Sequence, residues 1–315
     1  MDQLVNINEI PLSKLSCESV FQSPFWSFVK APLWSTYAFS YKTKSAEGTF
    51  LILVRKIFLS YSIAYIPFNL NNLDCNVLCE IAKKVKKVIK ENVILLRFDL
   101  PYYSDNFIFN KKLHRCKYSI QPESSIVINL TQELSFKKRV YRNLKKEEGV
   151  AISLWNGDDK DFSAWYDSYV ETSKRDNFQA RSKAYIKKFL NYNKGDVKPL
   201  LYLAKYQEKV IGGILNLRND SEEVYLFGSS SFIKDGVSCG YSLQTYAIEK
   251  AKRDSVKRYD LFGVDNKHLS KLITFKSSFG GELVNRTPSF DYYYNYFIAS
   301  SYRVVEDIRF KLRRG

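Results

Sequence analysis

The chain has 315 residues, of which 45% are hydrophobic and 16% aromatic. This composition excludes a disordered chain, and the length exceeds what one hydrophobic core usually supports, so two globular domains are expected. The 49 basic residues outnumber the 33 acidic ones and give a net charge of +16, which favours an anionic partner such as RNA, a nucleotide diphosphate or a membrane face.

No stretch of the sequence predicts a membrane span. The most apolar stretch, residues 50–68, is broken by Arg55 and Lys56, whereas a span needs about 18 uninterrupted apolar residues. The first three residues lack the basic segment followed by an apolar one that opens a secretory signal. We therefore expect a cytoplasmic protein, in contact with a membrane only at its surface.

Cysteine and histidine usage predicts neither a metal site nor a catalytic triad. Two cysteines would share one face of a helix, but no further pair completes a zinc set, and buried thiols are the expected outcome. No nucleophile elbow accompanies either histidine. We expect no cofactor. The residues concerned are Cys17, Cys75, Cys79, Cys116, Cys239, His114 and His268.

The elements of the first half follow from residue periodicity and capping. Residues 49–69 alternate β-branched and aromatic side chains and predict two strands. Asp74 suits the N-cap of a helix that runs to Lys90. The continuous apolar run over 93–100 predicts a buried strand, and residues 124–130 predict another.

A basic helix then opens the second half. Between Leu134 and Lys146 there are six basic residues and no acidic one. The spacing puts Lys138, Arg142 and Lys145 on one helical stripe, which fits either a solvated face or sequence-independent contact with RNA phosphates.

The remaining elements form a recognisable series. A strand over 150–155 precedes a helix that begins at Asp158 or Asp159 and carries Phe162, Trp165 and Tyr169 on one face. The other expected elements are a helix over 182–192, strands over 200–206, 210–218 and 223–230, a helix over 241–253, a strand at Tyr259 and a helix from Tyr293.

This order is that of an N-acetyltransferase-like (GNAT) domain, and the first half is a looser copy of it. We predict a mixed α/β (α+β) fold of two tandem GNAT-like domains, residues 1–135 and 136–291. The last helix, 292–315, is expected to pack on the first domain through Val304, Val305, Ile308 and Leu312. The alternative is an amphipathic helix on a membrane surface, although Glu306 and Asp307 interrupt its basic face.

A lone lysine marks the candidate site. Residues 259–264 read Tyr-Asp-Leu-Phe-Gly-Val, and residues 275–281 read Phe-Lys-Ser-Ser-Phe-Gly-Gly. Burying the ammonium of Lys276 between Phe275 and Phe279 is costly without a counter-charge. Either the lysine extends its head into water, or it faces a cleft and meets a phosphate or an oxyanion.

These two segments resemble the Y-D-[LF]-x-G-[IV] and F-K-x-x-F-G motifs of the Fem family. Its members are aminoacyl-tRNA-dependent transferases that build peptidoglycan cross-bridges. The resemblance runs from about Gln22 to Gly281, without the helical coiled-coil hairpin that some members insert. It implies that Phe275 and Lys276 are the catalytic pair.

The first domain carries two more motifs of the family. Residues 22–34 resemble the opening Q-S-x-x-W-x-x-x-K-x-x-x-W; the resemblance assigns Lys30 to the precursor phosphates, and Trp34 is the candidate for the border of the substrate groove. Residues 96–101 are similar to R-F-D-P with an inserted leucine. Asp99 would then orient the attacking amine, or simply hydrogen-bond the turn before Pro101.

Four residues of the second domain match the family's precursor-binding positions. Arg181 and Tyr185 fit R-x-x-x-Y and would project from one helix face. Tyr225 and Phe227 fit Y-x-Y, with phenylalanine in place of the second tyrosine. That departure removes a hydroxyl and puts the mode of precursor recognition in question.

The resemblance implies transfer of an amino acid from aminoacyl-tRNA to a side-chain amine of a peptidoglycan precursor. The partners would be the charged tRNA and UDP-MurNAc-pentapeptide, or its lipid-linked form, acting on a monomeric enzyme. Two alternatives stay open. A CoA-dependent acyltransferase would need a glycine loop over 235–240, where the glycine spacing is wrong. A non-catalytic RNA- or membrane-binding protein would explain the charge alone.

Overall fold

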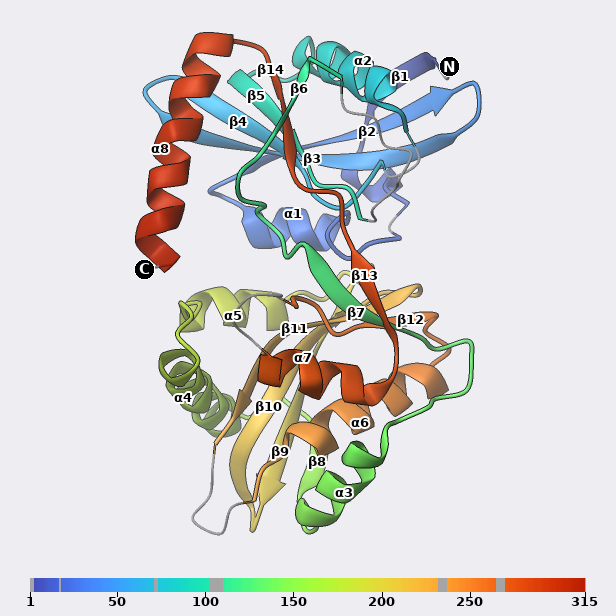
Figure 1. Cartoon of the computed structure of the whole chain (residues 1–315), viewed down its shortest axis with the longest axis vertical. Helices are drawn as coiled ribbons and strands as arrows, with labels where there is room; N and C mark the ends of the chain where they lie inside the picture. The colour runs from blue at the N-terminus through green and yellow to red at the C-terminus, as the bar shows by residue number, and fades with distance from the viewer. Residues whose placement is uncertain are drawn as a thin grey trace. The chain divides into compact units, whose positions relative to one another are not determined.

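The structure, a computed structural model, describes residues 3–16, 18–70, 73–101, 110–231, 237–264 and 270–314. Its contacts divide the chain into two compact units. Unit 1 contains residues 1–123 and 284–315, and unit 2 contains residues 124–283. Each unit is built on its own seven-stranded sheet with helices packed against it (Figure 1), so the mixed α/β fold predicted from the sequence is confirmed.

The sheet of unit 1 has the order β1-β2-β3-β4-β5-β14-β6. Only the pair β4 and β5 is parallel; the other pairs are antiparallel. The strand β14 comes from the end of the chain and lies between β5 and β6. The strands are β1 Leu4–Ile10, β2 Ser35–Thr43, β3 Glu47–Phe58, β4 Tyr61–Ile66, β5 Asn92–Phe98, β6 Leu113–Arg115 and β14 Phe290–Tyr293.

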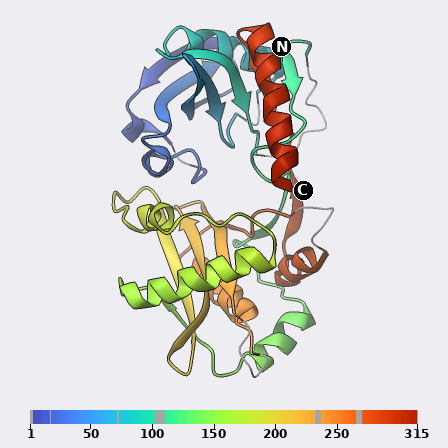
Figure 2. The same ribbon diagram turned by 90° about the vertical axis from the view of Figure 1, so that its left-hand side faces the viewer.

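Helices cover both faces of this sheet. The helix α2 (Cys75–Lys86) begins at the N-cap Asp74 and buries its apolar stripe against one face. The helix α8 (Tyr296–Arg314) lies along the other face, where Ala299 packs with Ile63 and Leu95 (Figure 2). The short helix α1 (Pro24–Lys30) contacts β2.

The sheet of unit 2 has the order β13-β7-β12-β11-β10-β9-β8. Its parallel pair is β11 and β12. The strand β7, which the sequence analysis assigned to the first domain, pairs with β12 here, because its apolar residues match the buried register of Tyr259. The strands are β7 Ser124–Asn129, β8 Ala151–Leu154, β9 Lys198–Tyr206, β10 Lys209–Arg218, β11 Glu222–Ser230, β12 Arg258–Asp260 and β13 Glu282–Asn285.

The described residues of unit 2 form five α-helices. They are α3 Lys138–Lys146, α4 Asp159–Arg175, α5 Lys183–Leu190, α6 Gly240–Arg253 and α7 Ser270–Lys276. The N-cap of α4 is Asp158, whose carboxylate accepts from two backbone N–H groups. The helix α6 packs its buried alanines and Ile248 against the sheet core, and α4 packs on β10 and β11.

The last helix contacts the sheet of unit 1 through Ala299 and Tyr302. Val304, Val305 and Ile308, which the sequence predicted for the packed face, are all exposed, and the side chain of Leu312 lies outside those that the structure describes. A polar interaction sets this orientation, because one side of α8 carries the acidic partner of a buried arginine.

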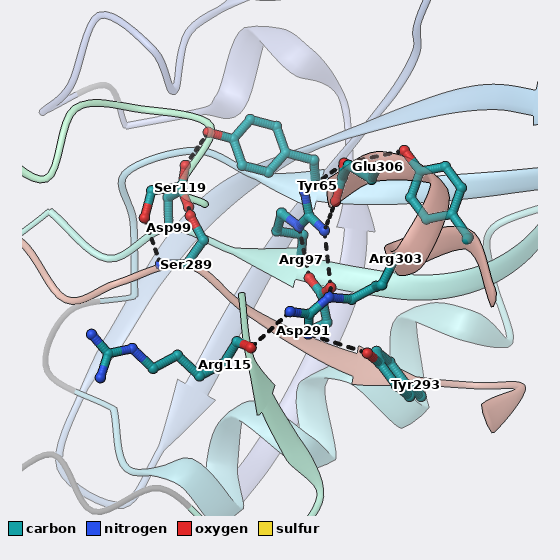
Figure 3. Close-up of polar contacts among 11 residues, drawn as sticks. Tyr65, Arg97, Asp99, Arg115, Ser119, Ser289, Asp291, Tyr293, Arg303 and Glu306 are labelled. Carbon is teal, nitrogen blue, oxygen red and sulfur yellow. Dashed lines mark hydrogen bonds and ion pairs between the residues drawn. The ribbon is translucent and has the colours of Figure 1, made fainter. Parts of the chain in front are cut away.

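That arginine is Arg97 of β5, which is 1% exposed (Figure 3). Its Nε and Nη2 donate to the carboxylate of Asp291 on β14 at 2.7 and 3.0 Å. Its Nη1 and Nη2 donate to Glu306 on α8 at 2.9 and 2.7 Å. The guanidinium therefore joins an early strand to the last strand and the last helix.

We expect Arg97→Met to destabilise the chain by about 3–5 kcal/mol, because it leaves Asp291 as a buried charge without its main partner. Urea unfolding followed by circular dichroism would measure the effect. Arg55→Met, at an exposed arginine of β3, is the matched control and should change the free energy of unfolding by about 0.5 kcal/mol or less. Equal effects of the two substitutions would show that the buried network is not a main source of stability.

Candidate functional site

Lys276 ends α7 with its side chain buried, 5% exposed. Its Nζ donates to the backbone carbonyls of Phe262 and Gly263, at 2.8 Å for Gly263. Burial lowers the pKa of this amine to about 8, although the charge of Asp260 acts in the opposite direction. The ammonium is therefore held by carbonyl dipoles, and a head extended into water, one of the two alternatives from the sequence, is not what the structure shows.

The carbonyls that hold Lys276 belong to the turn after β12. Phe262 and Gly263 both have positive φ, 45° and 59°, and for a phenylalanine this conformation is strained. The carboxylate of Asp260 supports the turn by accepting from the backbone N–H of Phe262 at 2.8 Å and from the hydroxyl of Ser125. The Y-D-L-F-G-V segment is thus a strand end that directs carbonyl groups at one amine.

The neighbours of Lys276 in sequence are fixed by packing. Phe275 makes edge-to-face contacts with Tyr241 and Phe279 at 5.0 and 5.1 Å between ring centroids. Gly280 and Gly281 have φ of 77° and 89°, and a Cβ on either would lie 2.7 Å from a backbone carbonyl oxygen. Glycine is therefore required at both positions for the chain to turn tightly after the lysine.

Tyr225 on β11 lies beside Lys276, with 5.5 Å between the ring centroid and Nζ. The structure therefore brings this predicted precursor-binding residue next to the predicted catalytic one. A β-bulge interrupts the β10–β11 pairing at this point, and bulges commonly redirect side chains near functional sites. Phe227 contacts the rings of Tyr169 and Phe189, each at 5.9 Å.

The pair Arg181 and Tyr185 is arranged differently from the prediction. Arg181 precedes the helix, because Ser182 is the N-cap of α5 and accepts from the backbone N–H of Tyr185. The two residues therefore do not share a helix face. They still meet, with the exposed guanidinium of Arg181 5.9 Å from the Tyr185 ring, and the Tyr185 ring contacts Phe189.

The basic helix α3 starts next to the Lys276 segment. The backbone N–H of Lys137 donates to the carbonyl of Ser278 at 2.9 Å, and the Phe136 ring contacts Phe279 at 6.0 Å. Lys138, Arg142 and Lys145, the predicted tRNA-binding residues, are exposed along α3. Unit 2 thus holds an exposed cationic stripe that continues from the candidate catalytic segment.

The N-terminus of α6 is occupied by a side chain of the protein itself. Glu147, which follows α3 and is 2% exposed, accepts from the backbone N–H groups of Tyr241 and Ser242 at 3.3 and 2.7 Å. Its carboxylate also accepts from Ser238 at 2.6 Å. A GNAT enzyme would place the CoA pyrophosphate at such a helix N-terminus. The internal carboxylate fills that position, which counts against the CoA-dependent alternative.

The family-like opening of unit 1 is mostly structural. The side chain of Gln22 accepts from the backbone N–H of Leu51 at 2.7 Å. Ser23 caps α1 by accepting from the backbone N–H of Trp26. The Nζ of Lys30 lies 4.4 Å from the centroid of the buried Trp26 ring. Trp34 is half-buried beside Tyr65. Lys30 and Trp34 are therefore the residues of this motif whose side chains are partly exposed.

Asp99 is buried in unit 1, where it accepts from the hydroxyls of Tyr65 and Ser289. Figure 3 shows it beside the Arg97 network. Burial raises its pKa to about 6, and the two hydroxyl donors limit the rise. Asp99 also lines a pocket about the size of one water molecule, together with Ser119, Gln121 and Arg286.

Several residues around these positions carried no recognisable pattern. Glu147 follows two lysines at a helix end and looks like a surface residue in the sequence, and no local signal relates it to the start of α6. Asp260 lies inside the Y-D-L-F-G-V segment, so the motif did point to it.

Four residues that the sequence analysis considered lie outside the part of the chain that the structure describes: Cys17, Asp235, Gly236 and His268.

Among the described residues, four cysteines are buried free thiols: Cys75, Cys79, Cys116 and Cys239. In that same part of the chain, histidine, cysteine and acidic side chains form no group of three that would hold a metal ion. None of the described helices combines the length and apolar content of a membrane span.

Comparison with known proteins confirms the resemblance found in the sequence. The model of the FemAB family matches residues 201–307, which include β12, Phe275 and Lys276. A solved structure described as the crystal structure of FemX matches with a TM-score of 0.77 at 16% identity, over 95% of this chain and 100% of that one. No curated protein matches the sequence significantly.

Two other solved structures share the fold at lower similarity. A tandem GNAT protein from the clavulanic acid biosynthesis pathway has a TM-score of 0.50 at 10% identity, over 82% of this chain and 83% of its own. The C-terminal domain of a putative lysylphosphatidylglycerol synthetase from Agrobacterium fabrum has a TM-score of 0.51 at 10% identity, over 86% and 87%. At these identities the likeness establishes the fold, and the tandem GNAT-like architecture predicted from the sequence is confirmed.

The burial of Lys276 predicts a pH-dependent stability. Its folded pKa of about 8 lies below the ordinary value of 10.5, so between these pH values the unfolded chain binds more protons and raising the pH favours the folded state. We expect the free energy of unfolding of the wild type to rise relative to Lys276→Met by up to about 3 kcal/mol from pH 8 to 10.5. Urea titrations at several pH values would measure it.

Lys271→Met is the control for this experiment, because Lys271 lies on the same helix but is exposed. Its difference from the wild type should stay constant with pH. A constant difference for Lys276→Met as well would mean that the Lys276 ammonium is solvated.

Proposed function

We propose that the protein is an aminoacyltransferase of the Fem type, which moves an amino acid from aminoacyl-tRNA to a side-chain amine of a peptidoglycan precursor. The observation that carries the proposal is the setting of Lys276: a buried cation inside the segment matched by the FemAB family model. The FemX-like fold over 95% of the chain supports it.

The reaction needs little covalent chemistry from the enzyme. The precursor amine attacks the ester carbonyl of the charged tRNA, a C–N bond forms, and the ester C–O bond breaks. The proton lost by the amine ends on the departing 3′-terminal hydroxyl of the tRNA. The enzyme contributes proximity and stabilisation of the tetrahedral oxyanion.

Lys276 is our candidate for stabilising that oxyanion. An ammonium has three N–H donors, and two of them serve the carbonyls of Phe262 and Gly263. The third is the donor that we assign to the oxyanion. The carbonyls fix the amine in place before the substrate arrives, which is what electrostatic preorganisation requires. Phe275 supports this position through its contacts with Tyr241 and Phe279.

Substrate contacts are proposed for the remaining matched residues. In unit 2, the Tyr225 ring lies beside Lys276, and the guanidinium of Arg181 lies over the Tyr185 ring. For Arg181, Tyr185, Tyr225 and Phe227 we propose contact with the precursor. In unit 1, Lys30 and Trp34 are proposed to bind the precursor, with UDP-MurNAc-pentapeptide or its lipid-linked form as the candidates. Asp99, with its pKa raised to about 6, is proposed to orient the attacking amine.

The exposed stripe Lys138, Arg142 and Lys145 is our proposed tRNA contact. It starts beside the Lys276 segment, as the Lys137–Ser278 hydrogen bond shows. A cationic surface next to the proposed oxyanion donor would hold the acceptor stem close to the reacting ester without reading sequence.

Lys276→Met should lower kcat for transfer from charged tRNA by about 10²–10³, the usual effect of losing one oxyanion donor. In the wild type, kcat should also fall above pH 8, because Lys276 loses its proton there. Single-turnover transfer to the uridine-linked precursor measures both effects, with Lys271→Met as the matched control. Wild-type kcat in Lys276→Met would remove the lysine from the mechanism.

The tRNA affinity should depend strongly on salt. Each phosphate contact contributes about 0.7–0.9 to the slope of log K against log salt, so replacing Lys138, Arg142 and Lys145 with glutamine should lower the slope by about 2. Filter binding between 50 and 200 mM salt tests this. The control carries the same charge change at the end of α2 and its C-cap, at the exposed residues Lys83, Lys84 and Lys87, and an equal loss there would show that only net charge matters.

A further inference from the structure

The outward face of α8 is an apolar stripe. Phe297 is 82% exposed, Val304 60%, Ile308 52% and Val305 45%. Spacings of seven and four residues put Phe297, Val304 and Ile308 on one side of the helix, and Val305 borders this row. Tyr296, 62% exposed, adds a second aromatic ring at the start of the helix. Single exposed apolar residues are ordinary, but a continuous row on one helix marks an interaction surface.

Packing on unit 1 does not use this stripe. The inner side of α8 contacts the sheet through Ala299 and Tyr302, and Glu306 is bound to Arg97. Arg303 donates to the carbonyl of Arg115 at 2.9 Å. The Arg97 network therefore sets the rotation of the helix about its axis and directs the apolar row outward.

The charge around the stripe is mostly positive. Arg309 and Lys311 are exposed on the same helix. Of its two acidic residues, Glu306 is neutralised by the buried guanidinium of Arg97, which leaves the half-buried Asp307. An apolar row with basic neighbours has the composition of helices that lie in the interface of an anionic bilayer.

We propose that α8 docks the protein on an anionic lipid surface, with the row Phe297, Val304, Val305 and Ile308 inserted among the acyl chains and Arg309 and Lys311 beside the headgroups. A stable protein interface needs about 20–30 residues on each side, far more than one helix row supplies. A bilayer requires no such matching surface. The chain's net charge of +16 also favours an anionic surface.

The β3–β4 turn of unit 1 also exposes an apolar and two basic side chains. Tyr61, which follows the β3–β4 turn, packs against the same apolar cluster as Ala299. In that turn Leu59 is 78% exposed, and Arg55 and Lys56 on the adjoining end of β3 are exposed as well. The proposal concerns where the protein resides and does not depend on the reaction proposed above, since vesicle binding is measured without any substrate.

The test is co-sedimentation of the full chain with vesicles at 0.15 M salt, near the physiological ionic strength. One set is phosphatidylglycerol mixed with phosphatidylcholine, and the other is phosphatidylcholine alone. We expect binding to the first set only. The double substitution Phe297→Glu with Ile308→Glu should lower binding by about tenfold or more, because it puts two charges at the apolar contact. Arg309→Gln with Lys311→Gln should weaken binding by about fivefold per residue.

The matched control is Val5→Glu with Leu283→Glu, which makes the same charge change at two exposed apolar residues outside α8. It should bind vesicles like the wild type, and melting curves would verify that all variants are folded. The proposal is overturned if the wild type ignores anionic vesicles, or if the control loses binding equally. It is also overturned if the wild type is a dimer that Phe297→Glu with Ile308→Glu converts to a monomer, since a second copy would then cover the stripe.

Discussion

Unit 1 depends on one buried guanidinium. Arg97 bonds Asp291 and Glu306 from the middle of β5, and those two residues come from the last strand and the last helix. A buried guanidinium is costly unless its N–H donors have acceptors. The carboxylates of Asp291 and Glu306 are therefore both needed here. Unit 1 is therefore complete only when the last strand and the last helix pack on the strands of the first part of the chain. Residues 284–315 accordingly belong to unit 1.

The same interaction orders the neighbouring polar groups. Arg97 of β5 pairs with Asp291 of β14, and Asp99, the residue after β5, accepts from the hydroxyl of Ser289, the residue before β14. Because Arg97 and Asp291 are register partners, their side chains lie on one face of the sheet, the face that α8 covers. The charge of Arg97 lowers the pKa of Asp99 and that of Asp291 raises it, beside the larger effect of burial. The charges of Arg97 and Asp291 thus link the Arg97 network electrostatically to the candidate residue Asp99.

Unit 2 uses buried charge in a different way. Lys276 is held by carbonyl dipoles, and burial lowers the pKa of its amine to about 8 against the opposing effect of the Asp260 charge. Glu147 is held by N–H dipoles at the start of α6. The Glu147 carboxylate occupies the N-terminus of α6, where an external anion could otherwise bind. The carbonyls of Phe262 and Gly263 accept from two of the three N–H donors of the Lys276 ammonium. The Glu147 carboxylate thus occupies the position that a CoA pyrophosphate would need at this helix N-terminus.

The sequence alone determined the helix α2, the series from β8 to α6 and the identity of the lysine segment, because these rest on local signals. Examples are the Asp74 cap, the apolar stripe of α2 and the Gly-Gly turn after Lys276. Only the tertiary structure decided that β7 joins the second sheet, that Glu147 closes α6 and that Val304 and Ile308 point outward. Each of these depends on a partner remote in sequence, and residue periodicity identifies an apolar face without saying which surface will cover it.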